Sequence, residues 1–211
     1  MQPKLIIFDL DGTLYDLRDV QSVNYDMQVR FVMQEKHLSK EEAVSLLDEN
    51  NVYPIITTES KSATEFFARE GLDMVKWKQF REVKFDVTKI DKRKATTENV
   101  VRNFNAICPL VLLSSNSYTI ILQTLAYLGI DYHLFEDIVC SDNTTDKPFN
   151  KKSAMQMIAV KNNVKFDEML SIGDRYQTDV LPMIELGGKG IVIDNPFELQ
   201  LLLDELKNQR I

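Results

Sequence analysis

Five short apolar runs, separated by segments with helical periodicity, constrain the fold of this chain more than any other feature. They cover residues 5–8, 110–113, 138–140, 169–172 and 190–193. None alternates strictly between apolar and polar side chains, as expected of parallel strands covered on both faces. The segments 119–128, 151–161 and 179–186 between the later runs carry apolar residues at helical spacing. This alternation predicts βαβ units, and therefore an α/β fold with a Rossmann-like, doubly wound parallel sheet.

The stretch between the first two runs has a different character. From about residue 17 to residue 105 it contains amphipathic helical patterns, the longest over residues 19–34, and no convincing strand. Ser39 and Glu42 form a capping-box pattern that predicts the start of a further helix. We therefore predict a core domain of residues 1–16 and 96–211, and an inserted helical cap domain of residues 17–95.

The balance of charge argues against two classes of partner. With 25 Lys and Arg against 32 Asp and Glu, the formal net charge is −7 at pH 7. A chain of this charge is not expected to bind nucleic-acid polymers non-specifically or to be attracted to anionic membranes. No apolar run approaches the ~18 residues that a membrane-spanning helix needs.

The cysteines and the N-terminus indicate the compartment. Cys108 and Cys140 each stand beside an apolar run and do not form a C-x-x-C pair, so we expect two buried free thiols. The apolar stretch near the N-terminus is too short for a signal peptide and meets aspartate at once. These features predict a cytoplasmic protein.

The first apolar run is followed at once by two carboxylates. Asp9 and Asp11 stand two positions apart, and Gly12 and Thr13 follow with the character of a turn and a helix start. Two such carboxylates are costly to hold together, because like charges raise each other's pKa. A bound metal ion, or a division of chemical roles between the two groups, normally offsets that cost.

The next three runs are also followed by polar residues suited to phosphate chemistry. Ligands of an open α/β sheet bind at the carboxyl ends of its strands, so these residues are predicted to meet at one edge. Each of them alone also fits an ordinary helix cap, exposed lysine or surface carboxylate. Their joint occurrence in this order favours a functional site. The residues are Ser114, Ser115 and Asn116, then Lys147, then Asp174 and Asp179.

Together these residues resemble the motifs of the haloacid dehalogenase (HAD) superfamily, a family of Mg²⁺-dependent aspartyl-phosphate phosphatases and phosphotransferases. DLDGTLYD matches the first motif, LLSSNS the second, Lys147-Pro148 the third, and GDRYQTD, residues 173–179, the fourth. The helices inserted between the first two motifs are similar to the C1-type cap of the family. The resemblance implies a Mg²⁺-dependent phosphatase that hydrolyses a small phosphomonoester.

The resemblance also implies roles for the four aspartates. Asp9 would attack phosphorus and become a phosphoaspartate, and Asp11 would protonate the leaving oxygen and then take a proton from water. Mg²⁺ would be held by the carboxylates of Asp9 and Asp174 and by the backbone carbonyl of Asp11. Asp179 would act through water or by orienting its neighbours.

The phosphoryl oxygens would be bound by residues of the second and third motifs. Ser115 is the implied serine, because the family places Asn directly after it, and Ser114 is the alternative. Asn116 and Lys147 would complete the phosphate-binding set, with Lys147 offsetting negative charge.

Alternatives within and beyond this reaction class stay open. The TLY sequence after Gly12 and the helical cap are similar to the pyrimidine 5′-nucleotidase-like branch, which implies nucleoside monophosphate substrates, although Gly12 stands where that branch often has Asn. The dehalogenase branch does not keep an aspartate at the position of Asp11, so Asp11 favours phosphoryl transfer. The alternatives to a phosphatase are a phosphomutase that uses the same Asp9 and Asp11 on a sugar phosphate, and a non-catalytic binding module, although no motif residue is missing.

Overall fold

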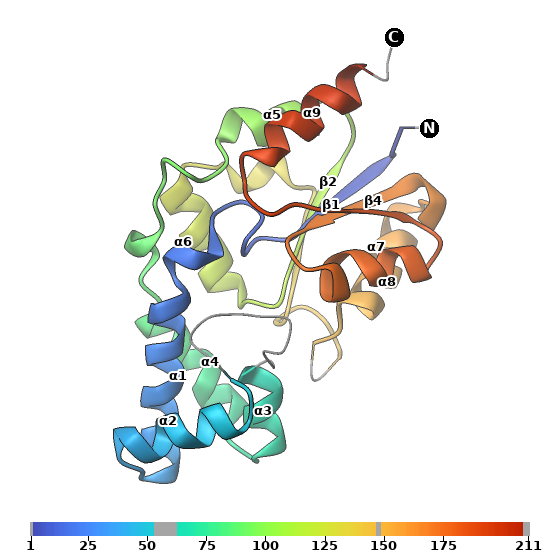
Figure 1. The fold of residues 1–211 in the computed structure, drawn as a ribbon. Helices are drawn as coiled ribbons and strands as arrows, with labels where there is room; N and C mark the ends of the chain where they lie inside the picture. The colour runs from blue at the N-terminus through green and yellow to red at the C-terminus, as the bar shows by residue number, and fades with distance from the viewer. Residues whose placement is uncertain (1, 53–62, 147–148, 209–211) are drawn as a thin grey trace. The chain divides into compact units, whose positions relative to one another are not determined.

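The computed structural model of the 211-residue chain describes residues 2–52, 63–146 and 149–208. The chain divides into two compact units (Figure 1). One consists of Met1–Leu17 and Ile90–Ile211 and is called the sheet unit here; the other, Arg18–Lys89, is called the helical insert.

The sheet unit contains one five-stranded parallel sheet, in agreement with the predicted fold class. The strand order is β3-β2-β1-β4-β5, so the chain extends the sheet first to one side of β1 and then to the other. The strands are β1 (Leu5–Phe8), β2 (Leu110–Ser114), β3 (Asp137–Cys140), β4 (Met169–Gly173) and β5 (Lys189–Val192).

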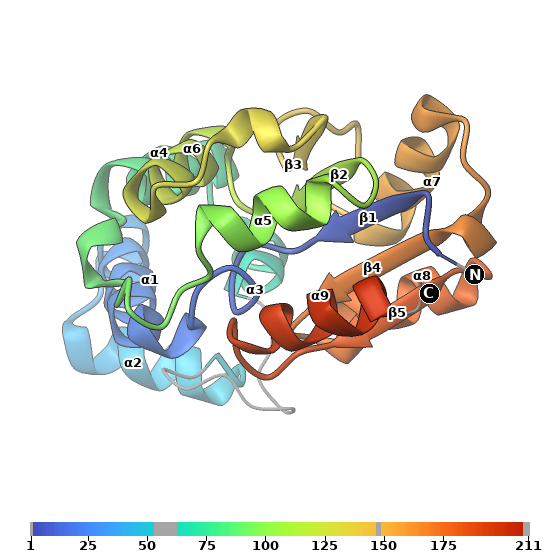
Figure 2. The ribbon, with the colours of Figure 1, turned by 90° about the horizontal axis from the view of Figure 1, so that it is seen from above.

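Helices cover both faces of this sheet. Figures 1 and 2 show α5 and α9 on one face and α7 and α8 on the other. The helices of the unit are α5 (Glu98–Asn105), α6 (Tyr118–Leu128), α7 (Lys151–Asn162), α8 (Leu181–Glu185) and α9 (Glu198–Asn208), with the 3₁₀ turns η3 (Tyr132–Leu134) and η4 (Phe166–Glu168) and the π-helical turn η5 (Tyr176–Val180).

Each face of the sheet buries its own set of apolar side chains. Leu5 and Ile7 of β1 belong to the cluster that includes Met155 and Ile158 of α7. Phe8 of β1 meets Phe104 of α5 edge to face, with ring centroids 5.1 Å apart. Because both faces are packed, the strands read as continuous apolar runs in the sequence.

The register of the parallel strands gathers their carboxyl ends at one edge. Phe8, the last residue of β1, pairs with Leu112 of β2 and with Ile172 of β4. Residues directly after these strands therefore lie next to one another, although they are far apart in the sequence. This edge is where an open α/β sheet binds its ligands.

The helical insert contains α1 (Gln21–Lys36), α2 (Lys40–Glu49), α3 (Ala63–Arg69) and α4 (Met74–Lys84), flanked by the 3₁₀ turns η1 (Leu17–Asp19) and η2 (Val87–Lys89). Its core is aromatic: Phe31 lies 5.0 Å from Trp77 and 5.4 Å from Phe67, centroid to centroid. The predicted capping box is present at the start of α2, where Ser39 and Glu42 each accept a hydrogen bond from the backbone of the other.

The second boundary between the units differs from the prediction. The helical insert ends at Lys89, whereas the sequence pattern placed its end at residue 95. The intervening residues are tied to the sheet unit. Lys92 lies over the ring of Tyr127 at 4.0 Å, the Tyr127 hydroxyl donates to the Ile90 carbonyl at 3.4 Å, and the Thr96 amide donates to the Leu14 carbonyl at 2.9 Å.

Two helical segments also depart from the sequence analysis. The helix predicted over residues 179–186 is divided into the π-helical turn η5 and the short helix α8, which has Pro182 in its first turn. The C-terminal helix α9 was not predicted, although its buried Leu199, Leu202 and Leu206 follow helical spacing.

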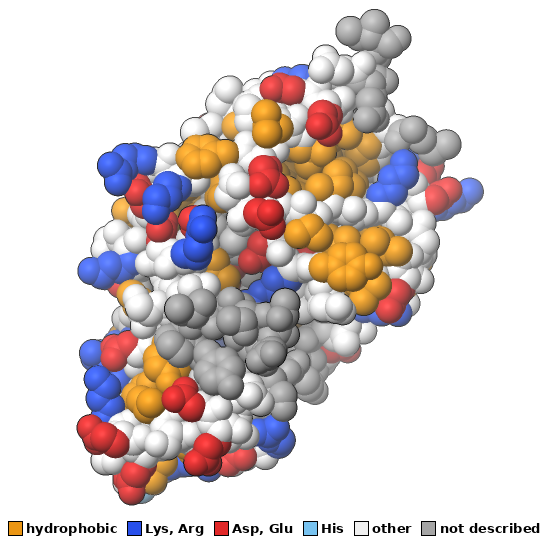
Figure 3. All heavy atoms as spheres, viewed as in Figure 1, with side chains coloured by type: hydrophobic (Ala, Val, Ile, Leu, Met, Phe, Trp, Pro, Cys, Tyr) orange, Lys and Arg blue, Asp and Glu red, His pale blue; other side chains and the backbone are white. Residues whose placement is uncertain are grey.

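Three global expectations concern thiols, membranes and charge. Cys108 and Cys140 are buried free cysteines, as predicted. Among the described residues, no helix combines the length and the apolar character that crossing a membrane requires. Acidic and basic side chains both occur over the visible face of each unit (Figure 3).

Candidate active site

A cluster of carboxylates lies at the carboxyl edge of the sheet. Asp9 follows β1, and its amide donates to the Ile172 carbonyl at the end of β4 at 3.0 Å. Asp174 follows β4 directly, and Asp179 lies in η5. One carboxylate oxygen from each of these three residues lies within 4.8 Å of the others. The structure thus brings together three of the four aspartates that the sequence analysis singled out, and the fourth, Asp11, follows two residues after Asp9.

A lysine that the sequence analysis did not select bridges two of these carboxylates. The Nζ atom of Lys151 lies 2.7 Å from Asp9 Oδ1 and 2.6 Å from Asp179 Oδ1. Lys151 is the first residue of α7, whose N-cap Asn150 accepts a hydrogen bond from the Ser153 amide. The predicted Lys147 lies outside the described residues. The sequence signal for Lys151 was its place at the start of a helix that follows β3.

Asp179 is buried, and its carboxylate is hydrogen-bonded by neighbouring protein groups. It is 2% exposed, and besides the bond from Lys151 its carboxylate accepts hydrogen bonds from the Thr178 hydroxyl and the Arg175 amide, both at 2.9 Å. Its backbone carbonyl accepts a hydrogen bond from the Ser171 hydroxyl of β4 at 2.7 Å. A π-helical turn in this position is consistent with a functional site, where such turns are frequent.

Asp11 has a separate set of hydrogen-bond donors. The Tyr15 hydroxyl donates to Asp11 Oδ1 at 2.7 Å, and the Asn116 amide group lies 2.9 Å from each of the two carboxylate oxygens. The predicted site residue Asn116 therefore contacts the carboxylate of Asp11. Tyr15 belongs to the first motif, but the sequence analysis assigned no role to its side chain.

The two serines after β2 differ in exposure. Ser114 is buried, and its hydroxyl accepts a hydrogen bond from the backbone amide of Asn116 at 3.2 Å. Ser115 is exposed. Of the two hydroxyl groups, that of Ser115 is therefore the one that a ligand in solvent can reach.

Two glycines permit the close approach of the segments that carry the carboxylates. Gly12 has a φ of +77°, and a Cβ at this position would lie 2.2 Å from Asp174 Oδ2. A Cβ at Gly173 would lie 2.4 Å from the Cβ of Asp179. A side chain at either position would push the loop after β1 or the η5 turn away from the cluster. The present backbone at position 12 therefore favours glycine.

Burial and mutual repulsion shape the electrostatics of the cluster. Burial, opposed by Lys151 and reinforced by the neighbouring aspartates, raises the pKa of Asp9 well above its usual range. Burial and the charge of Asp179 raise the pKa of Asp174 to about 7. For Asp179, burial opposes ionisation, but Lys151 and the donated hydrogen bonds prevail and lower its pKa. The pKa of Lys151 is raised despite its burial, because it faces Asp9 and Asp179.

The donor set fits a hard divalent cation. Carboxylate oxygens are the ligands that Mg²⁺ and similar ions prefer. Burial and, secondarily, the neighbouring aspartates raise the pKa of Asp9 and of Asp174, so a cation bound between these two carboxylates would favour their ionised forms. Asp9 and Asp174 are the residues best placed to hold such an ion, because Asp179 already accepts hydrogen bonds from Lys151, Thr178 and Arg175.

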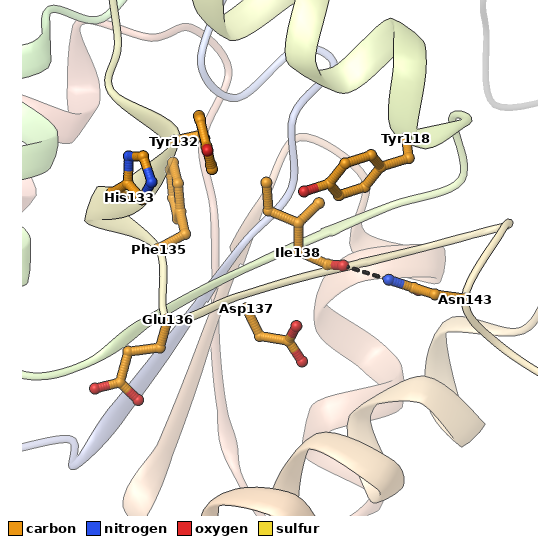
Figure 4. A pocket seen from close by; sticks show the side chains of 8 residues that line it. All are labelled: Tyr118, Tyr132, His133, Phe135, Glu136, Asp137, Ile138 and Asn143. Atoms are coloured by element: carbon orange, nitrogen blue, oxygen red, sulfur yellow. Dashed lines mark hydrogen bonds between the residues drawn. The ribbon is translucent and has the colours of Figure 1, made fainter.

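A separate cavity of about 620 Å³ lies along the edge strand β3 (Figure 4). Tyr118, Tyr132 and Ile138 are among the residues that line it, and the Ile138 carbonyl accepts a hydrogen bond from the side-chain amide of Asn143 at 2.6 Å. None of the residues that line this cavity belongs to the carboxylate cluster. The cavity is therefore not the candidate active site.

Comparison with solved structures supports the fold. The chain is similar to a HAD phosphatase from Thermococcus onnurineus (17% identity, TM-score 0.61, 92% of this chain and 86% of that chain covered). It is also similar to a HAD-hydrolase from Bacillus subtilis bound to magnesium (14%, 0.57, 97% and 100%) and to a 2-haloacid dehalogenase from Pseudomonas syringae (16%, 0.57, 100% and 100%). At these identities the likeness establishes the fold alone.

Comparison with families is more specific. No curated protein matches the chain. A family model described as haloacid dehalogenase-like hydrolase matches residues 3–187, which include β1 to β4, the helical insert and the carboxylate cluster. By this match, which extends over most of its length, the chain belongs to the haloacid dehalogenase-like hydrolase family and is an enzyme that acts on small molecules.

Proposed function

We propose that this hydrolase is a Mg²⁺-dependent phosphatase that cleaves a small phosphomonoester through a phosphoaspartate on Asp9. One observation carries the proposal. A buried carboxylate at the end of β1 lies against Lys151, Asp174 and Asp179, and a second carboxylate, Asp11, is held two residues further on by its own donors.

The two carboxylates divide the chemistry. In the first step an oxygen of Asp9 attacks phosphorus, the bond from phosphorus to the ester oxygen breaks, and Asp11 gives its proton to that oxygen. In the second step a water oxygen attacks the phosphorus of the phosphoaspartate while Asp11 takes a proton from the water. Phosphate leaves, and the carboxylate of Asp9 and the protonated form of Asp11 are restored.

Asp9 must be ionised to attack, although burial raises its pKa. Positive charge beside it favours the ionised form, and Lys151 supplies part of that charge at 2.7 Å. A Mg²⁺ ion held by Asp9, Asp174 and the backbone carbonyl of Asp11 would supply the rest and would neutralise charge on the phosphoryl oxygens.

Phosphate binding falls to the residues that face the same edge. Lys151 provides a cation for the phosphoryl oxygens, and the exposed Ser115 provides a hydroxyl donor. Lys147, which the third motif implies, is a second candidate cation. The polar contact of Asn116 is to Asp11, so we assign it to the general acid rather than to the phosphate.

The hydrogen bonds of Asp11 favour phosphate esters over haloacids as substrates. An alkoxide is a poor leaving group and needs a proton, so an acid at this position accelerates the cleavage of a phosphate ester. A halide leaves as a stable anion and needs none. The acid role that we propose for Asp11, whose carboxylate contacts Tyr15 and Asn116, serves the first reaction and is not needed in the second.

We propose that the helical insert, Arg18–Lys89, supplies the contacts that select the leaving group. The four motifs contain no residue suited to recognising the base or the sugar of a substrate. By the resemblance to the pyrimidine 5′-nucleotidase-like branch, nucleoside monophosphates are the first substrates to test.

The test is a parallel assay of the purified chain in water labelled with heavy oxygen. Nucleoside monophosphates, sugar phosphates, p-nitrophenyl phosphate and a 2-haloacid are each offered with Mg²⁺. We expect release of inorganic phosphate that carries the heavy oxygen, because water attacks phosphorus. Halide release with heavy oxygen in the Asp9 carboxylate would instead identify a dehalogenase. Isomerisation of a sugar phosphate without release of phosphate would identify a phosphomutase.

A further inference from the structure

Two buried side chains, Tyr15 and Asn116, make three close contacts with the carboxylate of Asp11. Its Oδ1 atom accepts a hydrogen bond from the Tyr15 hydroxyl at 2.7 Å and lies 2.9 Å from Asn116 Nδ2, and its Oδ2 atom also lies 2.9 Å from Asn116 Nδ2. The residues Tyr15 and Asn116 are 1% and 2% exposed. Both donors are therefore shielded from water, which would otherwise compete for the same hydrogen bonds.

The backbone fixes Tyr15 relative to Asp11. The amides of Thr13 and Leu14 both donate to the Leu10 carbonyl, at 3.3 and 2.9 Å, which closes a tight turn directly after the first carboxylate. Asp11 and Tyr15 are paired as an isolated backbone bridge across this turn. The Tyr15 ring is thereby held against the same short loop that carries Asp11.

The backbone of Asn116 is fixed by hydrogen bonds at both its amide and its carbonyl group. Its backbone amide donates to the Ser114 hydroxyl at 3.2 Å, and its carbonyl accepts from the Ser141 hydroxyl at 3.0 Å. The carboxamide therefore projects from a fixed backbone toward Asp11, which lies on a different strand end.

From this arrangement we infer that Tyr15 and Asn116 are positioning residues that fix the orientation of the Asp11 carboxylate for proton transfer. This inference rests on the proposed function. Asn116 contacts both oxygens, whereas Tyr15 contacts Oδ1 alone, so we assign the proton that goes to the leaving group to Oδ2. Small errors in the orientation of a catalytic group are costly, because proton transfer requires direct hydrogen-bond reach.

The dependence of the rate on the leaving group separates this role from a merely structural one. Nitrophenolate leaves readily without a proton, whereas an alkoxide does not, so only alkyl phosphates depend strongly on an aligned acid. We therefore compare kcat/KM for an alkyl phosphate and for p-nitrophenyl phosphate in Tyr15→Phe and Asn116→Ala. Tyr127→Phe is the matched control, because it removes a tyrosine hydroxyl that is bonded to a carbonyl of the same unit.

We expect Tyr15→Phe to lower kcat/KM for the alkyl phosphate roughly 10-fold to 100-fold and for p-nitrophenyl phosphate about threefold or less, since general acids contribute on the order of 100-fold or more. Asn116→Ala should show the same bias, and Tyr127→Phe should keep the ratio of wild type. Equal losses on both substrates, or no loss on either, would overturn the positioning role while leaving the phosphatase intact. A wild-type chain inactive toward both esters would overturn the proposed function, and the positioning role with it.

Discussion

Replacing Asp174 by Asn is expected to stabilise the metal-free protein while removing its response to Mg²⁺. Burial and the charge of Asp179 raise the pKa of Asp174 from its ordinary value of 3.8 to about 7. Between these two values the folded chain retains a proton that the unfolded chain has lost. The free energy of unfolding therefore falls as the pH rises from about 4 to about 7, and it levels off above that range.

The size of the effect follows from the same pKa. A rise from 3.8 to about 7 corresponds to about 4 kcal/mol, at about 1.4 kcal/mol for each unit of pKa. Because solvent reaches part of this carboxylate, screening reduces the expected gain of Asp174→Asn to about 1–2 kcal/mol at about pH 8. The gain should disappear toward about pH 4, where the wild-type carboxyl is protonated in both states.

The assay is urea unfolding in EDTA at a series of pH values, repeated with Mg²⁺. Asp179→Asn is the matched control, because Lys151 and the donated hydrogen bonds lower the pKa of Asp179, so that its charge stabilises the fold. The control should be less stable than wild type above the ordinary pKa of aspartate. Wild type should gain stability from Mg²⁺, and Asp174→Asn should not. An Asp174→Asn protein that is less stable than wild type in EDTA at about pH 8 would refute this reasoning.

Three further predictions concern the lysines, Gly12 and the metal. In steady-state kinetics, Lys151→Met should lower kcat on the order of 100-fold, and Lys147→Met should have a smaller effect. A larger effect of Lys147→Met would identify Lys147 as the main cation for the phosphoryl oxygens. Gly12→Ala, at a φ of +77° and against Asp174, should abolish the stabilisation by Mg²⁺ in thermal unfolding, whereas Gly129→Ala, at a φ of +74° with nothing within 4 Å, should be strained but keep it. EDTA should abolish phosphatase activity and added Mg²⁺ restore it; full activity in the chelator would exclude a metal-dependent mechanism.

The fold was readable from the sequence because a doubly wound sheet leaves a strong local signal. Strands buried on both faces are continuous apolar runs, and β1 has the predicted bounds while β2 and β4 extend by one residue each. The position of the boundary between the two units near residue 90 could not be predicted from the sequence. It depends on contacts such as that between Lys92 and the ring of Tyr127. Such contacts join segments that are remote in the sequence.

Some residues of the candidate site could likewise be predicted from the sequence, and others could not. Asp9, Asp11, Asp174 and Asp179 could be selected from the sequence because each follows a strand. The contact of Lys151 with Asp9 depends on where α7 begins, and that of Tyr15 with Asp11 depends on the turn closed at Leu10. Lys151 is remote from Asp9 in the sequence, and the contact of Tyr15 with Asp11 requires that particular turn rather than a helix. The contact of the Asn116 carboxamide with Asp11, on which we base our proposal for Asn116, is likewise visible only in the folded chain.

The most direct test of the account is to trap the covalent intermediate. The chain is mixed with a hydrolysed phosphomonoester and Mg²⁺, quenched in acid during turnover, digested and analysed by mass spectrometry, with Asp9→Asn treated in parallel. We expect the mass of one phosphoryl group on the peptide that contains Asp9, its loss on mild alkaline treatment, and no label in a folded Asp9→Asn protein, whose turnover should fall by several orders of magnitude. Phosphorylation of a different residue, or near-normal turnover by Asp9→Asn, would contradict the central claim.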